Sequence, residues 1–99
     1  MKTVRFLTEA EGELTGTRDE YESCRAGLGE EFVAEVETFT SLIAERPFIF
    51  GRFRSTDVRA CPLRRFPFNL LYLVGDDFIW IVAVAHQRRR PGYWMQRLR

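Results

Sequence analysis

The 99-residue sequence is poor in histidine, cysteine and lysine, and these shortages narrow the range of functions. It has one histidine and two distant cysteines, Cys24 and Cys61, with no Cys-x-x-Cys motif. A zinc site therefore has too few plausible ligands, and we expect both thiols to be reduced. Because the chain also has no glycine-rich phosphate loop and no carboxylate cluster, we predict neither a metal nor another cofactor.

Long hydrophobic runs are also missing. The two richest apolar stretches, 66–74 and 78–85, are short and are separated by Gly75-Asp76-Asp77, whereas a membrane helix needs about 20 apolar residues. The alternating start, Met1 to Phe6, has no apolar h-region, so we expect no targeting signal. The sequence predicts a soluble cytoplasmic protein with a single domain over residues 1–99.

The charges are divided unevenly along the chain. Residues 1–50 hold five basic and eleven acidic side chains, whereas residues 51–99 hold ten basic and three acidic ones. Fourteen of the fifteen basic residues are arginine, whose planar guanidinium suits carboxylates and phosphates. The basic half therefore predicts an acidic partner, either a nucleic acid or an acidic peptide.

Hydrophobic periodicity in the first half predicts a strand and two helices. Residues 3–7 alternate as a strand does, and apolar residues then recur every three or four positions from Leu7 to Cys24. Thr8 is a plausible N-cap, and the acidic residues that follow favour the positive end of the helix dipole; they are Glu9, Glu11 and Glu13. A second helix is expected from about Glu30 to Glu45, where an apolar stripe recurs at the same spacing, formed by Phe32, Val36, Phe39 and Ile43. The short loop between the two helices predicts an antiparallel αα-hairpin.

Three strands are expected in the second half, over Thr56–Leu63, Phe66–Val74 and Phe78–Ala85, with a hairpin turn at Gly75-Asp76. The last two are apolar on both faces. The helices can cover only one face of such a sheet, so the C-terminal segment or a partner protein must cover the other. The fold class is α+β: an N-terminal strand, an αα-hairpin and a three-stranded antiparallel meander, with the helices on one face of a small, mostly antiparallel sheet.

The last predicted strand runs directly into His86-Gln87-Arg88-Arg89-Arg90-Pro91-Gly92-Tyr93-Trp94. Arginines beside aromatic side chains can hold phosphates and stack on bases, and the same residue types dominate protein–protein hot spots. Alternatively, the two aromatic residues fold back onto the sheet. We take this stretch as the candidate target-binding site, formed by Arg88, Arg89, Arg90, Tyr93 and Trp94.

Three stretches resemble the RelE/ParE toxin superfamily. Residues 83–94 resemble its C-terminal signature, residues 64–72 resemble the strand before the last hairpin, and residues 27–36 resemble the start of the second helix. The resemblance covers nearly the whole chain and implies a RelE/ParE-like fold. It also implies a toxin that a cognate antitoxin neutralises by wrapping it with a helix and an extended, often acidic segment.

This resemblance also implies where the antitoxin meets the toxin in a hetero-oligomer. An antitoxin would cover the dry sheet face and neutralise the basic half of the chain. The antitoxin-binding residues that we predict are Trp80 for the first role and Arg59 and Arg65 for the second.

The superfamily has two branches, and the fold does not choose between them. ParE-like members bind DNA gyrase and block it, whereas RelE-like members cut mRNA in the ribosome. Arg88 occupies the position of the arginine that follows the last strand in the nucleases. However, Asn69 stands where the nuclease pattern has an arginine, and Trp94 where it has a tyrosine.

We therefore favour growth inhibition by binding DNA gyrase, with no reaction carried out by the toxin. The alternative is a ribosome-dependent mRNA endoribonuclease, which must activate the 2′-OH, stabilise the phosphate and protonate the leaving oxygen. Its catalytic candidates are Arg88, Tyr93, His86 and Arg65. An inactive or repurposed relative is a third interpretation.

Overall fold

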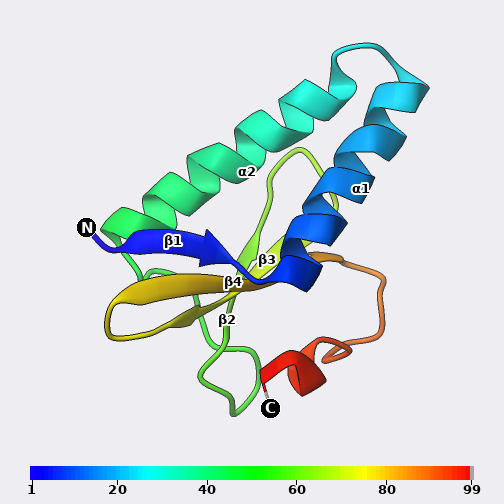
Figure 1. The fold of residues 1–99 in the computed structure, drawn as a ribbon. Coiled ribbons are helices and arrows are strands. Elements are labelled where there is room, and N and C mark those ends of the chain that lie inside the picture. The colour runs from blue at the N-terminus through cyan, green and yellow to red at the C-terminus, as the bar shows by residue number, and fades with distance from the viewer. Residues whose placement is uncertain (99) are drawn as a thin grey trace.

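The computed structural model describes residues 1–98 and shows two helices packed on one face of a four-stranded sheet (Figure 1). Its elements are β1 (Thr3–Phe6), α1 (Thr8–Cys24), α2 (Leu28–Glu45), β2 (Arg59–Pro62), β3 (Phe68–Val74), β4 (Phe78–His86) and a short 3-10 helix, η1 (Met95–Leu98). The predicted α+β class and order of elements are confirmed. None of the helices within residues 1–98 is long and apolar enough to cross a membrane.

The sheet has the strand order β1-β4-β3-β2. The last three strands form the predicted antiparallel meander, while β1 pairs in parallel with β4, with Val4 opposite Ile79. The sheet is therefore mixed. The register shifts beside Leu71, because Leu71 pairs with Ala83 and the next residue pairs with Ile81. Val82 is thus an extra residue, as in a β-bulge.

The start of α1 differs from the prediction. Leu7, not Thr8, is the N-cap, and no side chain caps the helix. The Leu7 N–H donates to the Ile81 carbonyl at 3.0 Å, so pairing with β4 keeps the chain extended up to the residue before the helix. The sheet thereby determines where α1 begins, and Thr8 becomes its first helical residue.

Two of the three strands predicted in the second half begin too early, while the third, β4, begins at Phe78 as predicted. The Thr56 hydroxyl donates to the Phe53 carbonyl at 2.6 Å and forms a turn, so β2 begins only at Arg59. Similarly, the Phe68 N–H donates to the Phe66 carbonyl at 2.8 Å, and β3 begins at Phe68. Local hydrogen bonds of this kind compete with strand pairing.

The two helices approach each other closely at their connection. Gly27 has a φ of 88°, a conformation that glycine adopts without steric cost. The Glu22 carboxylate accepts hydrogen bonds from the N–H groups of Gly27 and Gly29, at 2.9 and 3.0 Å. A Cβ atom at Gly29 would lie 2.5 Å from the Arg18 carbonyl oxygen, so this position has no room for a side chain.

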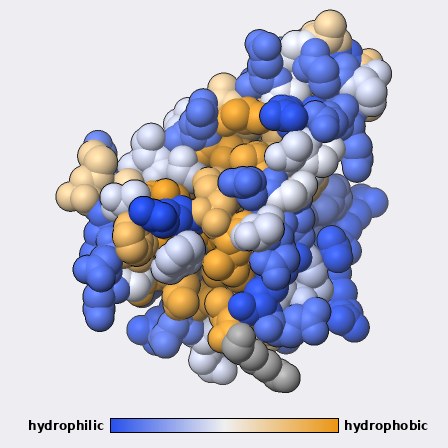
Figure 2. Space-filling model, viewed as in Figure 1, coloured by the Kyte–Doolittle hydropathy of each residue, from blue (hydrophilic) through white to orange (hydrophobic). Residues whose placement is uncertain are grey.

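The main core lies between the helices and the sheet. The predicted stripe of α2 supplies Phe32, Val36 and Ile43, all buried, and they pack with Leu70, Tyr72, Ile79 and Ile81 of the sheet. An aromatic cluster closes one end, where the Phe32 ring lies 5.2 Å from the Phe66 ring in an edge-to-face arrangement. On the face seen in Figure 2, hydrophobic residues gather across the centre, with hydrophilic residues on both sides.

Part of the opposite face of the sheet, here called the far face, is covered by the chain itself. Its core cluster consists of Val58, Leu71, Val82, Ala83, Ala85 and Trp94. The Trp94 side chain is only 2% exposed and lies 5.1 Å from the Phe53 ring. The sequence allowed two covers for this apolar face, the C-terminal segment or a partner protein. The structure shows the first, in which Trp94 of the C-terminal segment covers the face together with the loop over residues 53–58. This part of the sheet therefore needs no partner protein to cover it.

Candidate target-binding site

Residues 87–98, here called the C-terminal segment, turn sharply at the end of β4 and fold back under the sheet (Figure 1). The Gln87 N–H donates to the Pro67 carbonyl at 2.8 Å. The Arg88 N–H donates to Nδ1 of His86 at 3.0 Å, and the Arg89 N–H donates to the His86 carbonyl at 3.0 Å. His86 is therefore part of the turn that places the three consecutive arginines at one end of the molecule.

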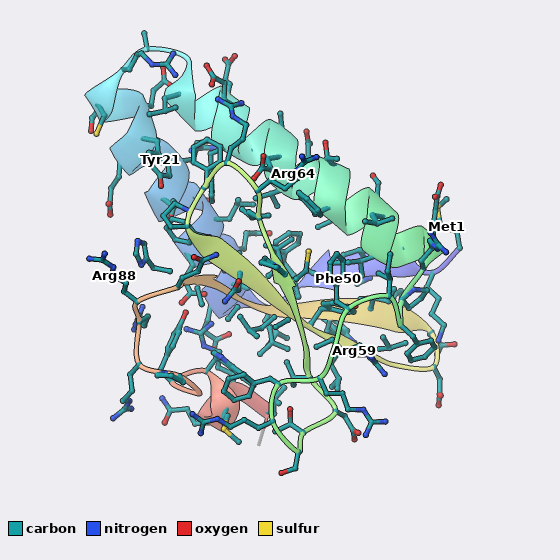
Figure 3. The ribbon with its side chains drawn as sticks, turned by 180° about the vertical axis from the view of Figure 1, so that it is seen from behind. Met1, Tyr21, Phe50, Arg59, Arg64 and Arg88 are labelled. Carbon is teal, nitrogen blue, oxygen red and sulfur yellow. The ribbon has the colours of Figure 1, made fainter. Side chains whose placement is uncertain are left out.

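The three arginines have different surroundings. Arg88 and Arg90 are exposed and make no ion pair within residues 1–98, and Figure 3 shows Arg88 pointing away from the body of the protein. Arg89 instead lies over the Tyr93 ring, 3.8 Å from its centroid, with a guanidinium nitrogen 3.9 Å from the Glu13 carboxylate. Arg88 and Arg90 are thus free to meet a partner, while Arg89 is held by the fold.

A hollow of ≈ 110 Å³ lies between the C-terminal segment and the far face of β3 and β4. Its polar lining consists of Asn69, His86, Gln87, Arg89, Arg90 and Tyr93, and it contains no carboxylate. Such a lining favours an anionic group. Arg88, which matches the arginine of the nuclease pattern, is not among the residues that line it.

The phenol of Tyr93 is already engaged. Its hydroxyl donates to the Glu13 carboxylate at 2.6 Å. Burial, and then the hydrogen bond to this carboxylate and its negative charge, raise the pKa of Tyr93 to about 12. The raised pKa makes the phenol a poor base at neutral pH, and its one proton is already donated to Glu13, so it is also poorly placed to give that proton to a substrate.

Glu13 and Arg97 are central to this region, although the sequence analysis assigned neither of them to it. Arg97 of η1 donates to both oxygens of the Glu13 carboxylate, at 2.9 Å each, and to the Val82 carbonyl at 3.0 Å. The Val84 N–H also donates to this carboxylate, at 3.1 Å. Burial raises the pKa of Glu13, but the hydrogen bonds from Arg97, Tyr93 and Val84 outweigh it and lower that pKa below its usual value.

One signal could have identified Glu13. It lies three residues after the buried Ala10 and four before Thr17, on the stripe of α1 that faces the sheet. An acidic residue on such a stripe needs a cationic partner. Instead, the sequence analysis grouped it with Glu9 and Glu11 as a carboxylate favoured by the helix dipole.

Trp94 was predicted to bind the target. Its indole is buried between the sheet and Phe53, so it presents no surface to a partner in this conformation. It has the structural role that the sequence analysis kept as the alternative. Within residues 1–98, no group of three or more His, Cys, Asp or Glu side chains could hold a metal ion.

Comparisons with known proteins agree with this architecture. The model of a family described as the ParE toxin of the type II toxin–antitoxin system parDE matches residues 4–91. The chain belongs to the ParE toxin family. No curated protein matches the sequence.

Two solved structures share the fold of this ParE-family toxin. One is from the chromosomal ParDE toxin–antitoxin system of P. aeruginosa, with a TM-score of 0.65, 20% identity, and 87% of this chain and 96% of that chain covered. The other is from the toxin–antitoxin complex RelBE2 of Mycobacterium tuberculosis, with a TM-score of 0.61, 23% identity, and 86% and 96% coverage. The family match ends at residue 91, so Tyr93 and Arg97, which both donate hydrogen bonds to Glu13, lie outside it.

The three residues predicted to bind the antitoxin do not form one site in this ParE-family toxin. Arg59 pairs with Tyr72 on the helix side of the sheet, donates to the Phe50 carbonyl at 2.7 Å and lies over the Phe48 ring. Trp80 pairs with Leu73 on the far face and is half-buried.

Arg65 lies in the turn after β2 rather than on a strand. It forms a 2.7 Å ion pair with Glu31 of α2. Because β3 begins only at Phe68, no strand holds Arg65. Its ion pair with α2 fixes its side chain instead. A partner that met all three residues would have to extend around the molecule.

Proposed function

We propose that this ParE-family toxin inhibits growth by binding its target without cutting RNA, and that the target is DNA gyrase. The observation that carries the proposal is the state of Tyr93, whose hydroxyl donates a hydrogen bond to Glu13 and whose pKa is raised to about 12. Tyr93, the candidate for proton transfer in a nuclease, therefore uses its hydroxyl to hold the fold together. The choice of gyrase rests on the resemblance to the ParE-like branch.

The remaining side chains of the site also favour binding over catalysis. Asn69 is a neutral residue in the lining of the hollow, where the nuclease pattern has a cation. Arg88 and Arg90 are exposed and carry charges that attract an acidic surface and speed its association. The candidate target-binding surface is therefore Arg88 and Arg90, with the hollow beside them.

We also propose that a cognate antitoxin covers the part of the far face that the chain leaves open. There Trp80 and Phe78 form a half-buried aromatic pair, with ring centroids 5.8 Å apart, and the Arg5 guanidinium lies 4.3 Å from the centre of the Phe78 ring. Aromatic residues beside arginine are typical anchors of protein interfaces. Both structural neighbours come from toxin–antitoxin systems, which supports a partner of this kind.

Two assays on the purified toxin test the proposed target: supercoiling by DNA gyrase, and cleavage of mRNA on programmed ribosomes. Blocked supercoiling with intact mRNA is the expected result. Codon-positioned cleavage with unaffected gyrase would overturn the proposal and make Arg88, His86 and Tyr93 the catalytic candidates.

Variants separate the two mechanisms further. Removing both exposed arginines (Arg88→Ala with Arg90→Ala) should weaken gyrase inhibition by roughly tenfold or more, because a binding surface responds in a graded way to lost charge. Arg18→Ala, which removes an exposed arginine of α1, is the matched control and should change little. Tyr93→Phe should alter inhibition only a few-fold, whereas a nuclease that used this phenol would lose activity by about two to four orders of magnitude.

A further inference from the structure

The Glu13 carboxylate joins α1, β4 and the C-terminal segment. We propose that Glu13 is a positioning residue, which fixes the C-terminal segment so that Arg88 and Arg90 are presented to the target in one defined arrangement. This inference rests on the proposed function, because it assigns target binding to those two arginines. It concerns a residue of α1 that makes no contact with the target itself.

Glu13 accepts a hydrogen bond from the part of β4 that has no neighbouring strand on the β1 side. The parallel pairing with β1 reaches Phe6 opposite Ile81, and its last hydrogen bond is from the Leu7 N–H to the Ile81 carbonyl. Beyond that point the edge of β4 has no neighbouring strand. There the Val84 N–H donates to Glu13 and the Val82 carbonyl accepts from Arg97, so a side-chain ion pair satisfies backbone groups that would otherwise lack partners.

The same carboxylate anchors the C-terminal segment. Arg97 binds both its oxygens, Tyr93 donates to it, and Arg89 reaches within 3.9 Å of it. The side chains of Glu13 and Arg97 are only 17% and 14% exposed. Both Arg89 and Arg97 also lie over the Tyr93 ring, 3.8 and 5.1 Å from its centroid. Two cations and an aromatic ring are thus packed around one acidic group.

The anchor determines the shape of the arginine turn. One end of the turn is fixed at His86, which accepts from the N–H groups of Arg88 and Arg89. The other end is fixed where Arg89 and Tyr93 meet Glu13. Arg90 lies between these two points. A turn held at both ends presents its side chains already ordered, which reduces the entropy lost on binding.

The test compares Glu13→Gln with Glu11→Gln. Both remove one carboxylate from the first half of α1, but Glu11 is exposed and, among residues 1–98, takes part in none of the hydrogen bonds or ion pairs that hold Glu13 to the C-terminal segment. Gyrase inhibition and backbone hydrogen exchange are measured for both. Glu13→Gln should lower the inhibitory potency roughly tenfold, which corresponds to 1.4 kcal/mol. It should also remove the protection of residues 87–98 while α2 and β3 stay protected, and Glu11→Gln should match the wild type.

A double-mutant cycle distinguishes positioning from a general loss of stability. If Glu13 acts through Arg88, then Arg88→Ala should weaken inhibition much less in the Glu13→Gln background than in the wild type, because the two effects share one cause. Equal effects of Arg88→Ala in both backgrounds would overturn the inference. So would unchanged protection of residues 87–98 in Glu13→Gln.

The outcomes also separate the inference from the proposed function. A wild-type toxin that does not inhibit gyrase would refute the proposed target. In that case the double-mutant cycle is repeated with growth arrest of cells that produce the toxin as the measured effect. The hydrogen-exchange test does not depend on the target and stays valid. Wild-type inhibition together with full potency of Glu13→Gln would refute the role of Glu13 and leave the proposed target standing.

Discussion

The two faces of the sheet are covered in different ways. The helix side is closed by α1 and α2 through apolar packing around Phe32, and the far face is closed by the irregular chain around Trp94. The helix-side cover is made of regular elements that pack along their length. Two contacts hold the far-face cover. One is the burial of the Trp94 ring, and the other is the set of hydrogen bonds to the Glu13 carboxylate, here called the anchor. The first cover is part of the main core, and we expect the second, which is irregular chain held at these contacts, to open locally while the main core stays folded.

This difference matters for function because the exposed arginines belong to the second cover. Arg88 and Arg90 lie between the end of β4 and the anchored Tyr93. Binding segments are generally drawn from the less stable parts of a fold. We therefore expect stability and target binding to depend on different residues, and four measurements test this difference between the two covers.

The largest effect is expected on the helix side. Phe32→Ala removes a fully buried ring that packs against Phe66 and Phe68, and it should lower the free energy of unfolding by about 3 to 5 kcal/mol. Urea denaturation followed by circular dichroism measures this loss. A loss below about 1 kcal/mol would show that the site collapses around the cavity, and that the aromatic cluster is not the centre of the core.

Trp94→Ala is the corresponding truncation on the far face. Because the C-terminal segment can detach by itself, the global free energy of unfolding should fall less, by about 2 kcal/mol. Hydrogen exchange should show that residues 87–98 lose protection. If the loss equals that of Phe32→Ala, the two covers unfold as one unit and the contrast between them disappears.

Two glycines of the helix pair provide a smaller, matched comparison. At Gly29 a Cβ atom would lie 2.5 Å from the Arg18 carbonyl oxygen, whereas at Gly16 it would meet nothing within 4 Å. Gly29→Ala should therefore destabilise the protein by about 1 to 3 kcal/mol through overpacking, and Gly16→Ala should stabilise α1 by about 0.5 to 1 kcal/mol. Thermal unfolding measures both, and equal shifts would argue against the close helix contact.

The smallest effect is a pH dependence of the anchor. Because hydrogen bonds lower the pKa of Glu13 in the folded state, its contribution to stability is present above the unfolded pKa, near 4.5. That contribution is lost as the pH falls through the lower folded value. The stability difference between the wild type and Glu13→Gln should therefore shrink as the pH falls below 4.5. A difference that stays constant into this range would show that Glu13 is not ionised in the anchor.

Much of the helix side was predictable from local pattern. The spacing of Phe32, Val36 and Ile43 predicted the buried stripe of α2, and the double-sided apolar pattern of β3 and β4 predicted two central strands. The boundaries that failed, at Thr8, Thr56 and Phe66, depend on single hydrogen bonds that hydrophobic periodicity does not report. The pairing of β1 with β4 also escaped the analysis, because its partner lies more than 70 residues away.

The sequence by itself determined the class of fold, the order of its elements, the resemblance to the toxin superfamily and the basic turn after the last strand. Each of these depends on residues close together in the chain. Contacts between distant parts of the chain bury Trp94, hold Arg89 against Tyr93 while Arg88 and Arg90 make no ion pair within residues 1–98, and let Glu13 anchor the C-terminal segment. Glu13 and Tyr93 are separated by 80 positions, and they meet because β1 ends early and leaves an edge of β4 for the side chains of α1 and η1 to complete.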